Sequence, residues 1–113
     1  MLLVLCAAVV GCGYPRVTGR VVFPDDSHLD RGTVVFENAH NTATGDIQPD
    51  GSYSMTCKEK EGVPYGTYRL SIRDEDETRS RVHSRYLLPH SSGLTLDVKG
   101  SMTYMMIVEK PDQ

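Results

Sequence analysis

Three side chains that can bind transition metals lie close together in the last third of the chain: His83, Tyr86 and His90. Imidazole nitrogens and phenolate oxygens are good ligands for iron, so a metal ion bound here would support ligand binding or catalysis. In a polar loop, however, such residues are more commonly surface or corner positions. A metal-dependent ligand binder or enzyme using the His83–His90 loop is therefore kept as the alternative hypothesis, and we predict no metal or cofactor.

Other candidate catalytic groups have little support. Cys57 has only Lys58 and Lys60 as neighbouring cations, and a nucleophilic cysteine also needs a nearby base, so we interpret it as a small apolar residue at a strand end. The acidic run 74–77 lacks the Asp-x-Asp-x-Asp-Gly spacing that wraps calcium. No serine lies in a Gly-x-Ser-x-Gly motif. The sequence therefore predicts a protein that is not an enzyme.

Two tyrosines are candidate ligand contacts. Tyr65 lies between Pro64 and Gly66, and Tyr86 follows Arg85, so both fall in expected loops. Aromatic rings on loops can stack on a sugar or a peptide while a rigid scaffold holds them. The alternative, which we favour, is that both rings cap the ends of a hydrophobic core.

The first residues are apolar and small and run into Cys12. Residues 1–11 resemble a bacterial lipoprotein signal peptide, although no Lys or Arg precedes the apolar run. The resemblance implies export, cleavage and acylation of Cys12, with the protein lipid-anchored to the bacterial cell envelope on its periplasmic or surface side. The alternatives are a buried strand over residues 2–10 and, without acylation, a Cys12–Cys57 disulfide.

Composition limits the size and the partners of the remaining chain. Residues 12–113 suffice for one domain of about 100 residues. We expect a tether at 12–16, a sandwich domain at 17–109 and a tail at 110–113. Because 12 Lys and Arg face 15 Asp and Glu, with no long basic run, nucleic acid is not an expected partner.

Alternation of apolar and polar residues dominates the chain and predicts β-strands. Tyr68, Leu70 and Ile72 form the clearest example and are expected to face a core. The loop 99–101 contains Gly100 and predicts a terminal hairpin. The segment 74–81 has the spacing of a short helix, although a loop is equally compatible. The expected strands cover residues 16–23, 32–37, 43–47, 52–56, 67–73, 94–98 and 102–108.

These features predict an all-β fold: a single Ig-like or transthyretin-like antiparallel β-sandwich of about seven strands, Greek-key type. Five turn and strand motifs follow one another along the chain: VTGRV (17–21), GTVVF (32–36), PDGSYSM (49–55), PYGTYRL (64–70) and, after Tyr86, SGLTLDV (92–98). In this order they resemble the carboxypeptidase regulatory-like, transthyretin-like domain, in the small lipoprotein version found in planctomycete-type bacteria. Residues 24–29 depart from the usual first turn of that family.

The resemblance implies a fold more firmly than a function, because such sandwiches carry unrelated roles. We expect a non-catalytic, lipid-anchored extracytoplasmic module that binds, adheres or has a structural role in the cell envelope. Its expected partners are the membrane, through the lipid anchor, and an unidentified protein or carbohydrate.

Overall fold

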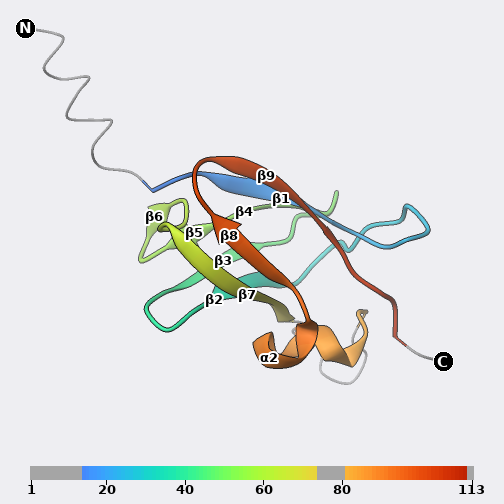
Figure 1. Ribbon diagram of the computed structural model, residues 1–113. Helices are drawn as coiled ribbons and strands as arrows, with labels where there is room; N and C mark the ends of the chain where they lie inside the picture. Colours follow the sequence, from blue (N-terminus) through green and yellow to red (C-terminus); the bar gives the residue numbers. More distant parts are fainter. Residues whose placement is uncertain (1–13, 74–80, 112–113) are drawn as a thin grey trace, which may run out of the picture.

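The computed structural model describes residues 14–73 and 81–111, which form two β-sheets packed face to face, so the predicted all-β sandwich is confirmed (Figure 1). Two short helical segments, η1 (Ser84–Leu87) and α2 (Pro89–Ser92), follow the longest strand. The strands are β1 (Val17–Val22), β2 (Thr33–Glu37), β3 (Thr42–Asp46), β4 (Ser52–Ser54), β5 (Thr56–Cys57), β6 (Lys60–Glu61), β7 (Gly66–Arg73), β8 (Thr95–Val98) and β9 (Met102–Ile107).

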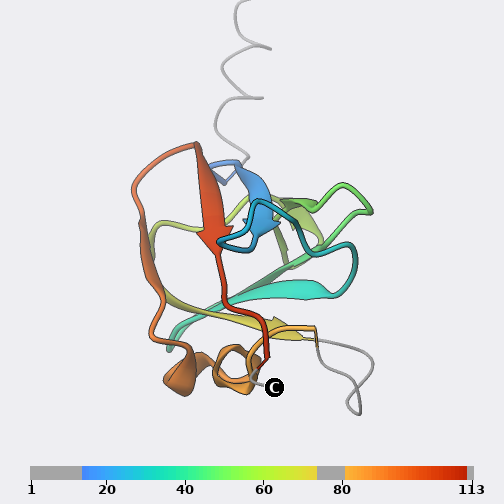
Figure 2. The same ribbon diagram turned by 90° about the vertical axis from the view of Figure 1, so that its right-hand side faces the viewer.

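One sheet has three strands in the order β4-β1-β9, and the other has six in the order β6-β5-β3-β2-β7-β8. Figure 2 shows the two layers after a quarter turn. The central strand β1 pairs antiparallel with β4 and parallel with β9. The predicted antiparallel arrangement therefore holds for every strand pair of the described residues except β1–β9, in which the two strands run in the same direction.

The predicted terminal hairpin is wrong. β8 pairs with β7 in the six-stranded sheet, whereas β9 pairs with β1 in the other sheet. Residues 99–101 therefore connect the two layers. Val98 and Met106 are both buried, and they reach the core from opposite sheets. Alternation of apolar side chains is the same for a hairpin and for such a crossing, so the pattern could not distinguish them.

The expected strand 52–56 is divided at Met55. The Met55 N–H donates to the Val17 carbonyl at 3.0 Å, and the Met55 carbonyl accepts from the Gly62 N–H at 2.8 Å. The chain passes from one sheet to the other at this residue, so β4 and β5 belong to different sheets. With the short strand β6, the described residues form nine strands, more than the number expected.

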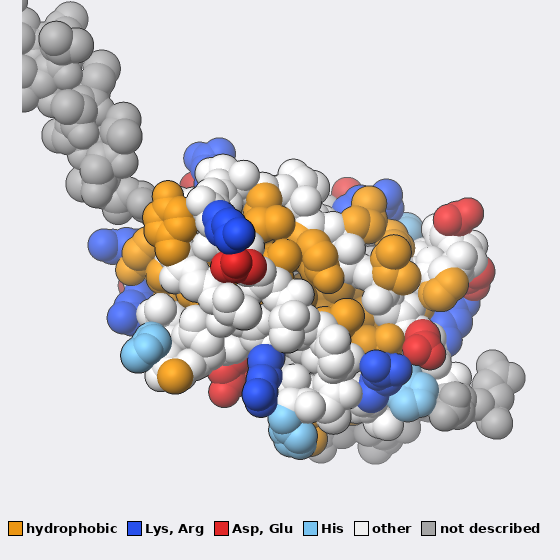
Figure 3. Space-filling view, viewed as in Figure 1, with side chains coloured by type: hydrophobic (Ala, Val, Ile, Leu, Met, Phe, Trp, Pro, Cys, Tyr) orange, Lys and Arg blue, Asp and Glu red, His pale blue; other side chains and the backbone are white. Residues whose placement is uncertain are grey.

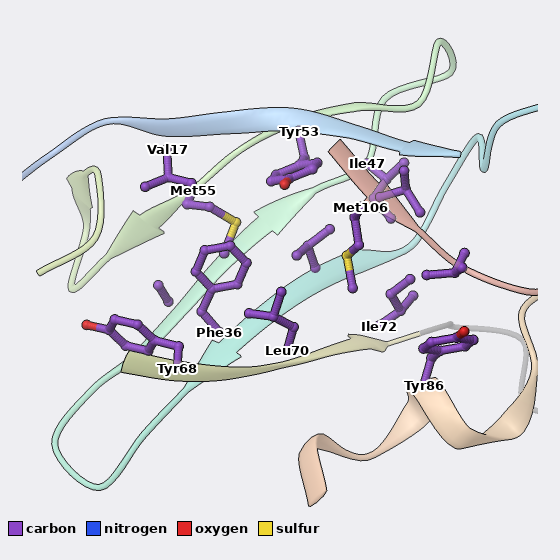
Figure 4. Packing of buried hydrophobic residues seen from close by; sticks show 14 of the residues in the cluster. Val17, Phe36, Ile47, Tyr53, Met55, Tyr68, Leu70, Ile72, Tyr86 and Met106 are labelled. Atoms are coloured by element: carbon purple, nitrogen blue, oxygen red, sulfur yellow. The ribbon is translucent and has the colours of Figure 1, made fainter. Parts of the chain in front are cut away.

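The core lies between the two sheets (Figure 4). Tyr68, Leu70 and Ile72 on β7 are fully buried, as their alternation predicts. From the opposite sheet, Tyr53 and Met106 point toward them. The expectations for residues 1–13 and for the acidic segment 74–80 lie outside the described residues.

The turn before β4 forms as its Pro-Asp-Gly sequence predicts. Gly51 has a positive φ of 87°, and its N–H donates to the Gln48 carbonyl at 2.8 Å. The Asp50 carboxylate accepts from the Ser52 hydroxyl at 2.6 Å and from the Ser52 N–H at 3.0 Å. These hydrogen bonds, with the hydroxyl contributing most, hold the pKa of Asp50 below its usual value.

Candidate functional site

The loop 83–90, kept as the alternative metal-binding candidate, folds into η1 and α2. Tyr86 is only 4% exposed and belongs to the hydrophobic core cluster. The His83 ring lies edge-on to it, with 6.5 Å between ring centroids, and its Nδ1 accepts from the Arg85 N–H at 3.1 Å. The Tyr86 ring therefore packs in the core, as the favoured capping interpretation expects, and the alternative that Tyr86 is presented to a ligand from a loop is wrong.

His90 faces a different surface. With Arg69 and Thr95 it lines a shallow groove of about 540 Å³ beside β2 and β7. Across residues 14–73 and 81–111, no three His, Cys, Asp or Glu side chains are grouped so as to hold one metal ion.

The remaining sequence candidates separate by burial. Tyr65 is 69% exposed, so the favoured interpretation that its ring caps the core is wrong, and a ligand contact at this ring stays a prediction. Cys57 is buried at the end of β5, and its thiol lies 3.5 Å from the Thr42 carbonyl as a weak donor. This is the packing of the small apolar residue that the sequence suggested.

A second groove, of about 740 Å³, lies on the outer face of the three-stranded sheet. The backbone of β1 forms its floor, and β3 and β5 form one wall. Hydroxyl side chains dominate its lining. The residues concerned are Thr18, Gly19, Arg20, Thr44, Gly45, Asp46, Gln48, Ser52, Tyr53, Ser54, Thr56, Thr103 and Met105.

Two side chains form hydrogen bonds that connect β1, the turn before β4, and β9 around this groove. The Arg20 guanidinium donates twice to the Asp50 carbonyl, at 2.8 and 3.1 Å. Beneath β1, the Tyr53 hydroxyl donates to the Tyr104 carbonyl at 2.7 Å. Burial raises the pKa of Tyr53 above the ordinary tyrosine value, and burial also raises the pKa of Tyr104. The Tyr53 side chain therefore supports β9 from below, whereas the partly buried Tyr104 side chain packs against the core.

The strand β9 bounds this groove on the side away from β3. The Met102 and Val108 N–H groups donate to backbone carbonyls at the two ends of β1, at 2.8 and 3.0 Å. Because a parallel strand directs alternate residues toward its neighbour, Thr103, Met105 and Ile107 direct their N–H and C=O groups to the opposite side. No strand within the described ranges lies on that side, since β9 is the last strand of its sheet.

The β9 edge is also apolar. Met105 is 50% exposed and Ile107 58% exposed, and no charged residue interrupts Met102–Ile107. Figure 3 shows hydrophobic side chains gathered along β8 and β9 on the viewed face. Natural sheets protect open edges with charges, proline or short strands, and β9 has none of these.

The other sheet edges in the described residues are protected. β6 consists of Lys60 and Glu61, and β8 carries Asp97. β4 is short, and the Ser52 N–H and C=O are already bonded to Asp50 and Gln48. We define the candidate site as the β9 edge, residues 102–107, with the adjoining outer groove. Sequence reasoning missed it because residues 102–108 were assigned to a hairpin, although the uncharged run was visible.

The fold and this edge define a small all-β sandwich with one open, uncharged strand. No protein-family model and no curated protein matches the sequence. Among solved structures, the chain is similar to the crystal structure of a DUF3823 family protein from Bacteroides ovatus ATCC 8483, with a TM-score of 0.59 and 16% sequence identity.

That similarity covers 84% of this chain and 44% of the other, so this chain spans less than half the length of the solved protein. At such low identity the similarity shows the fold alone. Neither short helical segment of the described residues has the length and apolar character of a membrane-spanning helix.

Proposed function

We propose that this protein is a non-catalytic, lipid-anchored module of the bacterial cell envelope that binds another envelope protein by accepting an extended strand beside β9. The observation that carries the proposal is the open β9 edge, with half-exposed Met105 and Ile107 and no protecting charge. The partner strand would extend the sheet β4-β1-β9 by one position.

The chemistry of the edge favours a polypeptide over a carbohydrate. Thr103, Met105 and Ile107 offer N–H and C=O groups at every second residue, which is the repeat of an extended peptide. A sugar chain instead carries hydroxyl groups, at a spacing that its rings set and that differs from the repeat of an extended peptide. Because the edge carries no charge, the matching strand is expected to be uncharged and partly apolar along its length.

The outer groove gives this edge a route to selectivity. Thr103 and Met105 line the groove and also belong to β9. Outward side chains of an added strand would therefore lie beside Thr103 and Met105, and a long one would reach across β9 toward Thr18 on β1. Backbone pairing would provide affinity, and this surface would discriminate among partners.

The sandwich is assigned, within the same proposal, to the carboxypeptidase regulatory-like, transthyretin-like class. The Pro-Asp-Gly turn before β4 and the β7 alternation of Tyr68, Leu70 and Ile72 support that assignment, since both belong to motifs of the resemblance. Sandwiches of this class have unrelated roles, so the assignment by itself names no partner.

The anchor is tested by Cys12→Ala in the full chain. The wild-type protein should incorporate labelled palmitate and fractionate with membranes, because acyl chains contribute about 0.8 kcal/mol per buried methylene. The variant should lose both properties. Unchanged membrane fractionation of the variant would refute lipid anchoring at this residue.

The β9 site is tested by photo-crosslinking in cells. A photoreactive residue at Ile107 should give an adduct of defined mass, and the same group at Leu88, similarly exposed between η1 and α2, should not. Met105→Pro should abolish the adduct, since it removes one outward N–H while leaving the bonds to β1. Met105→Ala keeps that N–H and should retain the adduct.

Three results would contradict the proposal. They are equal labelling from Leu88, an adduct that persists in a folded Met105→Pro variant, and an adduct with the mass of two copies of this chain. Thermal unfolding of each variant establishes that the sandwich is intact.

A further inference from the structure

We infer that the end of the sandwich at which the described chain begins lies directly on the bilayer, with Tyr65 in the headgroup layer; this rests on the proposed acylation of Cys12. Figure 1 shows the described chain beginning beside β5, β6 and the β8–β9 loop. The partner at this surface is the phospholipid interface.

The length of the tether forces this proximity. Gly13 alone separates Cys12 from Tyr14. At about 3.5 Å per residue, the Cα atoms of Cys12 and Tyr14 cannot be more than about 7 Å apart. The headgroup layer is itself about 5–8 Å thick. An acylated Cys12 therefore leaves no room for a flexible spacer between the lipid and the sandwich.

The chain is fixed to the sandwich from Tyr14 onward. The Pro15 carbonyl accepts from the Val63 N–H at 2.9 Å, and the Arg16 N–H donates to the Ser101 hydroxyl at 3.1 Å. The Lys60 ammonium lies 5.8 Å from the centre of the Tyr14 ring. Because these contacts fix the chain to the sandwich, the anchor holds this end of the sandwich at the bilayer.

Tyr65 lies at this same end. It follows the segment held by the Val63–Pro15 hydrogen bond, and its neighbour Gly66 pairs with Val98 just before the β8–β9 loop. Its ring is 69% exposed, the largest exposure among the exposed large hydrophobic side chains of the described residues. Tyrosine is enriched at membrane interfaces because its ring enters the apolar boundary while its hydroxyl stays hydrated.

The charges at this end suit phosphate headgroups. The chain as a whole has a net charge of −3, yet this end has more cations than anions. Long Lys and Arg side chains can extend toward lipid phosphates. Figure 3 shows several of them around hydrophobic side chains at this end. The cations are Arg16, Lys58, Lys60 and Lys99, and the anions are Glu59, Glu61 and Asp97. Arg16 and Lys99 are paired with Glu61 and Asp97, at 3.2 and 3.6 Å, which leaves Lys58 and Lys60 against Glu59.

The chain has no tryptophan, so the test uses two variants, each with a single tryptophan, one at the tethered end of the sandwich and one at the opposite end. The full chain carrying Tyr65→Trp is produced in a bacterium with lipoprotein processing and reconstituted into phosphatidylcholine–phosphatidylglycerol vesicles with brominated acyl chains. Its emission should shift to shorter wavelength and be quenched. Ile107→Trp is the control, because Ile107 is similarly exposed but lies opposite Val22, at the far end of β1. The emission of this control should be unchanged.

Vesicle flotation distinguishes failure of the lipid anchor at Cys12 from failure of the proposed contact between Tyr65 and the bilayer. Protein that floats with the vesicles, with equal quenching in the Tyr65→Trp and Ile107→Trp variants, would overturn the inference and leave the anchor intact. Protein that does not float would overturn the anchor and the orientation together.

Discussion

Replacing Gly19 by alanine is expected to lower the free energy of unfolding by about 3 kcal/mol. A Cβ atom at this position would overlap the Tyr104 carbonyl oxygen of β9 and lie 2.7 Å from the Tyr53 hydroxyl. The first obstacle is backbone, which cannot rotate away as a side chain can. The parallel pairing of β1 with β9 would have to open to admit the methyl group.

Chemical denaturation measures this effect, and Gly100→Ala provides the control. Nothing lies within 4 Å of the Cβ that alanine would add at Gly100, in the β8–β9 loop. That variant should stay within about 0.5 kcal/mol of the wild type. Equal stability of the two variants would mean that β1 and β9 are not packed as closely as described.

Local patterns in the sequence predicted the strands and their buried faces. Along β7, Tyr68, Leu70 and Ile72 are buried because alternation directly reports which face of a strand meets the core. The Pro-Asp-Gly turn formed for an equally local reason, since Gly51 readily adopts the positive φ that the turn requires.

Pairing between distant strands could not be predicted. Met55 continues the alternation of its neighbours, yet the chain changes sheets there because the Val17 and Gly62 backbones bond to it from opposite layers. The parallel partner of β1 lies at the other end of the sequence. Nothing in the residues 102–108 themselves selects β1 over β8 as a neighbour.

The candidate site could not be predicted for the same reason. Whether the uncharged Met102–Ile107 run is an open edge depends on the order of strands in the sheet. Tyr86 and His83 were metal-ligand candidates because they are close in sequence. The Tyr86 ring, however, is buried in the core. Closeness in sequence indicates a shared segment and says little about a shared site.

The two proposed surfaces are compatible in one orientation. β9 begins with Met102, whose N–H is bonded to Arg16 near the tether, and ends with Ile107 beside Val22. If the tethered end lies on the bilayer, β9 runs away from the membrane over about 17 Å, at about 3.3 Å per residue. Its open edge would then face neighbouring proteins along the membrane.

Tyr68→Ala is expected to lower the free energy of unfolding by about 4 kcal/mol, in the range of large aromatic deletions from a core. The Tyr68 side chain is fully buried, its ring lies 6.1 Å from that of Phe36, and its hydroxyl donates to the Pro64 carbonyl at 2.7 Å. Thermal melting should detect this readily, since about 1 kcal/mol shifts Tm by about 4–8 °C in a domain of this size.

Tyr65→Ala removes the same side chain three positions earlier and should change the free energy of unfolding by less than about 0.5 kcal/mol, because that ring is 69% exposed. Tyr68→Phe isolates the hydroxyl and should cost about 1 kcal/mol. Comparable losses of unfolding free energy for Tyr65→Ala and Tyr68→Ala would contradict the assignment of Tyr65 to the surface and Tyr68 to the core. A stable Tyr65→Ala protein would show that the fold does not need this exposed ring, as its proposed contact with the headgroup layer requires.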